Sequence, residues 1–141
     1  MSHGPARNEL IGTLQAALAQ VPEVQLAILF GSQARGTHTD ASDIDLAVKF
    51  DPGSDVLQLT AAISKHCQRE VQLISLDALT IPLLEQIVRD GIVVFQRSPR
   101  VAGQWWSTAL STLALDGPWY ARMRDSWLRR VAERGLGDGR Q

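Results

Sequence analysis

Two aspartates separated by one residue, Asp43 and Asp45, are the side chains of this sequence best suited to hold a metal ion. They open an apolar stretch that ends at Phe50, and on a β-strand residues two apart point to the same face. The two carboxylates therefore project side by side and repel each other unless a cation lies between them. Two anionic oxygen ligands suit a hard ion such as Mg²⁺, which takes one or two carboxylates together with substrate phosphates.

A glycine–serine pair, ten residues before the first of these aspartates, supplies groups that bind an anion. Gly31 and Ser32 directly follow an apolar stretch over residues 24–30. Glycine lets the backbone approach a ligand closely. The following residues can start a short helix whose free N–H groups, with the Ser32 hydroxyl, face an anion. Arg35 adds a positive charge that neutralises a phosphate or pairs with Asp40 or Asp43.

Alternating strands and helices must position these groups. Apolar runs predict strands over residues 24–30, 43–50, 70–75 and 92–95, and helical spacing of apolar residues predicts helices over 6–20, 55–67 and 81–90. Ser54 or Asp55 is expected to cap the second of these helices and Thr80 the third, which Gly91 ends. This order predicts an α/β domain in two layers.

The composition changes after residue 97, where the strand patterns stop. We expect a domain over residues 1–97 and a helical extension over 98–141, with a helix that begins at Asp116, has Pro118 near its start, and is followed by a disordered tail. A solvated face with a packing stripe is the simpler interpretation of the extension. The alternative is a partner-binding surface, because tryptophan, tyrosine and arginine are enriched in interface hot spots. All four tryptophans lie in this extension: Trp105, Trp106, Trp119 and Trp127.

Bulk properties exclude several classes of protein. The 141 residues suffice for one hydrophobic core, and the net charge of −1 gives no basic field, so direct nucleic-acid binding is not expected. The one cysteine, Cys67, excludes an internal disulfide and a cysteine-cluster zinc site. No apolar run approaches 18 residues and the N-terminus lacks a signal-peptide core, so we expect a cytoplasmic protein without membrane contact.

The spacing of the two motifs resembles the signature of the DNA polymerase β-like nucleotidyltransferase superfamily: Gly31-Ser32, ten residues, then Asp43-x-Asp45. The fuller form, GSQARG followed by SDIDLAV, resembles the minimal nucleotidyltransferases, which are the MNT antitoxin partners of HEPN toxins in prokaryotes. This resemblance implies a two-layer nucleotidyltransferase fold with a mixed sheet of about four strands, plus C-terminal helices. It also implies ATP as substrate, bound by Gly31, Ser32 and Arg35, and two Mg²⁺ ions held by Asp43 and Asp45.

The same resemblance implies an antitoxin that transfers AMP from ATP to a tyrosine of a cognate HEPN-family ribonuclease toxin and so silences it. The family pattern also has a third carboxylate on a later strand, which helps to deprotonate the attacking hydroxyl. Here that place falls on Gln72, which is neutral and cannot act as a base. Glu70, two residues earlier on the same strand face, is one possible substitute for the catalytic carboxylate, and Asp77, after the strand, is a more distant one. Otherwise the site has only two carboxylates.

Two further functions remain open at this point. A catalytically degenerate nucleotidyltransferase-fold antitoxin would neutralise its toxin by binding alone. A small-molecule nucleotidyltransferase of the aminoglycoside-modifying type usually carries a larger second domain than the extension found here. The sequence leaves open whether the chain forms homo-oligomers or hetero-oligomers.

Overall fold

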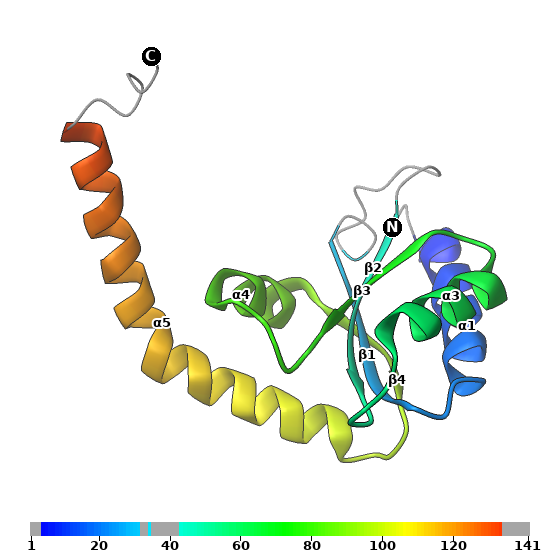
Figure 1. The fold of residues 1–141 in the computed structure, drawn as a ribbon. Coiled ribbons are helices and arrows are strands. Elements are labelled where there is room, and N and C mark those ends of the chain that lie inside the picture. Colours follow the sequence, from blue (N-terminus) through cyan, green and yellow to red (C-terminus); the bar gives the residue numbers. More distant parts are fainter. Residues whose placement is uncertain (1–3, 32–33, 35–42, 134–141) are drawn as a thin grey trace.

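A four-stranded mixed sheet forms the centre of the computed structural model, which describes residues 4–31, 34 and 43–133 (Figure 1). The strand order is β3-β2-β1-β4. β1 pairs antiparallel with both β2 and β4, whereas β2 and β3 are parallel. The predicted mixed sheet of four strands is thus confirmed, with the last strand at an edge. The strands are β1 (Val24–Phe30), β2 (Ile44–Phe50), β3 (Val71–Ser75) and β4 (Ile92–Gln96).

Local capping residues set the ends of the helices. The Asp55 carboxylate accepts hydrogen bonds from the Leu57 and Gln58 N–H groups in the first turn of α3, and the Thr80 hydroxyl accepts one from the first turn of α4. At the other end of α4 the Gly91 N–H donates to the Ile87 carbonyl over 2.8 Å. The predicted cap at Thr80 and the predicted stop at Gly91 are confirmed, and Asp55 rather than Ser54 caps α3. The helices are α1 (Gly4–Ala19), α3 (Val56–Cys67), α4 (Ile81–Asp90) and α5 (Val101–Glu133).

Helices cover both faces of the sheet, so the central strand β1 is buried on both sides. On one face, α1 and α3 pack against alternate strand residues, including the fully buried Ile44, Leu46 and Val48 of β2. On the other face, Ile28 of β1 packs with Ile87 of α4 and with the beginning of α5. Burial of each such aliphatic side chain contributes roughly 1.5–3 kcal/mol to the free energy of folding.

This division of β2 fixes the direction of the aspartates. Successive residues of a strand point to opposite faces. Because Ile44 and Leu46 point toward α1 and α3, Asp43 and Asp45 project toward the face that carries α4 and α5. The predicted orientation, with the carboxylates opposite the apolar set of β2, is confirmed.

The C-terminal extension contains one long helix instead of the separate helix predicted to begin at Asp116, and that prediction is wrong. α5 runs for 33 residues and includes Pro118 in its interior. Proline removes one backbone hydrogen bond and costs about 3 kcal/mol in a helix interior, and Gly117 beside it is also unfavourable, yet the helix continues between the helix-favouring segments 113–115 and 121–124. No helix in the described ranges, α5 included, is apolar enough over 18 residues to cross a membrane.

Only the first part of α5 packs against the rest of the protein. Its contacts are with α4, β1 and β4. Figure 1 shows the helix bending and then leaving the sheet, so its last turns stand apart from the body. The residues that seat it on the sheet face are Val101, Ala102, Trp105, Trp106 and Ala109.

Candidate active site

Three neighbouring strands bring the candidate site together around Asp45. In the antiparallel β1–β2 pair, Asp45 lies opposite Phe30, the last residue of β1. In the parallel β2–β3 pair, Asp45 lies beside Gln72. The turn that follows β1 and the first residues of β2 therefore meet at one end of the sheet. Asp45 is half-buried there, between a turn on one side and an amide side chain on the other.

Gly31 lies directly against the Asp45 carboxylate. Its φ is +76°, a left-handed conformation that side-chain-bearing residues rarely adopt. A Cβ added at Gly31 would stand 2.5 Å from Oδ2 of Asp45, far inside van der Waals contact. Both the backbone conformation and the available space therefore require glycine here. The predicted partners of Gly31 in nucleotide binding, Ser32 and Arg35, lie outside the described residues.

Gln72 reaches the other aspartate. Its Nε2 donates a long hydrogen bond of 3.4 Å to Oδ2 of Asp43, and both side chains are exposed. Asp43 and Asp45 share one strand face, and Gln72 is in register with Asp45, so all three side chains lie on the same face. Gln72 stands where the family pattern has a third carboxylate. In the structure its amide lies beside both aspartates.

Glu70 lies at the same end of the sheet but joins it through its backbone. Its carbonyl accepts a hydrogen bond of 3.1 Å from the Ile44 N–H, one step before the first β2–β3 pair. Its side chain is exposed. Within residues 4–31, 34 and 43–133, no three Asp, Glu, His or Cys side chains gather closely enough to hold a metal ion. A role for Glu70 as the substitute carboxylate stays a prediction.

The described side chains fit a hard divalent cation. Asp43 and Asp45 present two carboxylates on one face of the sheet, and Gln72 of the neighbouring strand β3 adds an amide beside them. Mg²⁺ accepts oxygen ligands of this kind together with phosphate oxygens. The Gln72 amide presents its N–H₂ group to Asp43 in this arrangement, and a half-turn of the amide would present its oxygen instead. Asp43 and Asp45 are the residues that would hold the ion.

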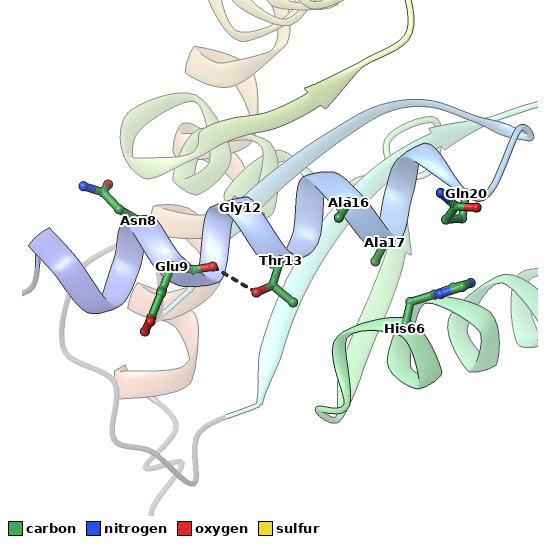
Figure 2. Close-up of a pocket in the computed structure, with 8 residues that line it drawn as sticks. All are labelled: Asn8, Glu9, Gly12, Thr13, Ala16, Ala17, Gln20 and His66. Carbon is green, nitrogen blue, oxygen red and sulfur yellow. Dashed lines mark hydrogen bonds between the residues drawn. The ribbon is translucent and has the colours of Figure 1, made fainter.

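A groove lies on the opposite side of the sheet, away from Asp43 and Asp45. Figure 2 shows the residues that line this groove between α1 and α3. Its volume is about 660 Å³. Its small residues, such as Gly12 and Ala16, leave it open. The Thr13 hydroxyl in it already donates to the Glu9 carbonyl over 3.0 Å. His66 at its border is exposed, as are the other polar residues that line the groove. The groove therefore contains no buried polar side chain that lacks a partner and would bind a ligand.

Two contacts of the site go beyond what the sequence predicts. The sequence indicates a flexible glycine after β1, but it does not indicate that the space beside that glycine belongs to Asp45. It also places Gln72 near the aspartates without indicating that the amide binds Asp43. A glycine immediately after an apolar strand is the only local signal for the first contact, and the second depends on the β2–β3 register.

Known proteins resemble this chain in sequence and in fold. The profile of the family "Polymerase beta, Nucleotidyltransferase" matches residues 12–100. A proposed protein adenylyltransferase of Methanocaldococcus jannaschii is 32% identical over 76 residues, which are 50% of this chain and 76% of that protein. The protein adenylyltransferase MntA of Shewanella oneidensis is 32% identical over 74 residues, 50% of this chain but only 53% of its own length.

A solved structure extends the likeness beyond the sequence match. A crystal structure described as a toxin–antitoxin with AMP-PNP contains a chain with a TM-score of 0.61 and 25% identity to this one. The match covers 86% of this chain and 98% of that chain, too large a share for residues 1–97 alone. The family profile spans residues 12–100, most of the sheet domain, and Gly31 lies against Asp45 within that span, so this chain belongs to the Polymerase beta nucleotidyltransferase family.

Proposed function

We propose that this protein transfers AMP from ATP to a tyrosine hydroxyl of a cognate HEPN-family toxin and thereby acts as an antitoxin. The observation that carries the proposal is the contact between the Gly31 turn and the Asp45 carboxylate, with Asp43 on the same strand face. A turn able to bind an anion, lying against one carboxylate of a pair on the same strand face, is an arrangement that suits a metal–triphosphate. The two curated relatives named as protein adenylyltransferases support a protein as the acceptor.

The proposed reaction needs positioning and charge neutralisation more than covalent chemistry. The tyrosine oxygen forms a bond to the α-phosphorus of ATP while the bond from that phosphorus to the bridging oxygen of the β-phosphate breaks. Pyrophosphate leaves with the electron pair, and the phenolic proton passes to a base or to water. In the proposal, Asp43 and Asp45 hold Mg²⁺, which neutralises the developing charge, and the Gly31 turn, with Ser32 and Arg35, binds the phosphates.

We further propose that the last turns of α5, residues 110–133, contact the toxin. This distal part of α5 stands apart from the body in Figure 1 and exposes apolar side chains: Leu115 is 79% exposed, Trp119 57% and Met123 49%. Large apolar residues beside arginines are typical of interface hot spots. The solved toxin–antitoxin neighbour, whose match reaches into the region of α5, supports this surface.

The test is a mass measurement on the toxin. The full chain, ATP and Mg²⁺ are incubated with the cognate HEPN-family toxin, and the toxin is analysed by intact-mass spectrometry. We expect the toxin to gain one or more AMP units on tyrosine. The matched control is the double variant Asp43→Asn and Asp45→Asn, which keeps the side-chain size and removes both charges. An unmodified toxin with the wild-type chain would contradict the proposal.

A second function remains in competition because of one observation, the neutral Gln72 beside the aspartates. In this alternative the chain is a catalytically degenerate nucleotidyltransferase-fold antitoxin that neutralises the toxin by binding. Growth of cells that carry the toxin distinguishes the two functions. If the Asp43→Asn and Asp45→Asn variant still protects the cells, binding suffices; if protection disappears while the complex still forms, catalysis is required.

A further inference from the structure

Gln72 occupies the position that decides the total charge of the candidate metal site. It lies in register with Asp45, and its amide donates to Asp43. The side chain of Gln72 therefore lies next to both carboxylates, where a bound cation would lie. An acidic residue at this position would be the third anion of the site. Glutamine adds oxygen and nitrogen atoms there but no charge.

We infer that Gln72 restricts this site to one firmly held divalent cation and leaves a second cation weakly bound. The inference rests on the metal site of the proposed function but not on the identity of the acceptor. It narrows the two-ion expectation that follows from the family resemblance. Gln72 thereby becomes a residue that determines how many ions accompany the nucleotide.

The charge balance supports this inference. Asp43 and Asp45 together carry two negative charges, which one divalent cation neutralises. Two adjacent dications repel each other about four times as strongly as two unit charges at the same distance. With a third carboxylate the site would offset part of this repulsion. With Gln72 the second ion depends on the triphosphate oxygens for its anionic ligands.

The hydrogen bond to Asp43 gives Gln72 a positioning role as well. Two carboxylates on one strand face repel each other, and Asp43 lies at the exposed beginning of β2, where its side chain can turn away. The amide N–H donates to Oδ2 of Asp43 over 3.4 Å and so limits how far this exposed carboxylate turns away. Loss of this amide should therefore weaken the first ion, whereas its replacement by a carboxylate should strengthen the second. A change that only disturbed packing would affect both substitutions in the same way, so this difference between them would show that charge at position 72 sets the binding of the second ion.

The experiment counts bound Mn²⁺, used as the probe for Mg²⁺. The full chain is saturated with a non-hydrolysable ATP analogue and titrated with Mn²⁺, and free Mn²⁺ is measured by electron paramagnetic resonance. We expect one ion per chain, with any second ion at least tenfold weaker. In Gln72→Asp the second ion should bind at least tenfold more tightly than in the wild type. If the aspartate side chain is too short to reach the ion, Gln72→Glu should show this gain instead.

Two controls accompany these variants. Gln72→Ala should keep one ion per chain but weaken it several-fold. Gln58→Asp adds the same charge on α3, which covers the opposite face of the sheet, and should change neither number nor affinity. Two ions of similar affinity in the wild type, or no gain in Gln72→Asp and Gln72→Glu, would overturn the inference. One bound ion with an unmodified toxin would refute the adenylylation of the toxin and leave the inference standing.

Discussion

Replacement of Gly31 by alanine tests the contact on which the site depends. The added methyl group would lie 2.5 Å from Oδ2 of Asp45, so the two must separate by about 0.9 Å to reach an ordinary contact of 3.4 Å. The left-handed backbone of Gly31 costs alanine about 1 kcal/mol. Turning Asp45 away from its rotamer costs a further 0.5–1.5 kcal/mol, on the order of the known off-rotamer penalty. We expect Gly31→Ala to lower the free energy of unfolding by about 2 kcal/mol.

Gly53 offers a matched control for this substitution. Its φ is +82°, so alanine suffers the same backbone strain, but nothing lies within 4 Å of an added Cβ. Gly53→Ala should therefore cost only about 1 kcal/mol. At about 4 °C per kcal/mol for a domain of this size, the melting temperatures should fall by about 8 °C for Gly31→Ala and about 4 °C for Gly53→Ala.

Binding of nucleotide separates the two variants more sharply than stability does. Isothermal titration calorimetry with Mg²⁺ and a non-hydrolysable ATP analogue should show affinity close to wild type for Gly53→Ala. For Gly31→Ala we expect a loss of affinity of about tenfold, because the displaced Asp45 carboxylate and the altered turn no longer meet the metal and the phosphates in the same geometry. Equal melting temperatures and equal affinities for the two variants would refute the role assigned to Gly31.

Three further predictions concern other parts of the chain. Gln68 ends α3 with a φ of 56°, so Gln68→Gly should raise the free energy of unfolding by about 0.5–1 kcal/mol, as measured by urea denaturation. Pro118→Ala should restore a helical hydrogen bond, increase helicity in circular dichroism, and strengthen α5 locally by up to about 3 kcal/mol. Combined Trp119→Ser and Met123→Ser should weaken toxin binding at least tenfold in biosensor measurements without lowering the melting temperature. Leu57→Ser, at an 81% exposed leucine of α3, is the control for that loss, and equal affinity for the two would contradict the assignment.

The sequence predicts most of the fold because its signals are local. The cap at Thr80 and the stop at Gly91 depend on hydrogen bonds within one or two turns, and such bonds can be read from neighbouring residues. The two faces of β2 follow from the alternation of apolar and polar residues along one strand. For the same reason, the shared direction of Asp43 and Asp45 is predictable before any tertiary contact is known.

The remaining features depend on contacts between distant segments. The hydrogen bond from Gln72 to Asp43 requires the register of a parallel pair, which two separate strand patterns do not specify. Pro118 illustrates a different difficulty. Its usual place in the first turn of a helix predicts a start there, but the helix-favouring segments 113–115 and 121–124 lie about a turn away on each side, and α5 continues through Pro118.

The strand order gives the two halves of the candidate site unequal resistance to opening. Gly31 follows β1 and Asp45 belongs to β2, the two inner strands, each of which has a neighbour on both sides. Gln72 belongs to β3, a five-residue strand at the edge. Edge segments fray more readily than central ones, so amide hydrogen exchange should be faster in the edge strands β3 and β4 than in β1 and β2. The turn and its carboxylate would then stay together through fluctuations that briefly release the amide, and only global unfolding would separate them.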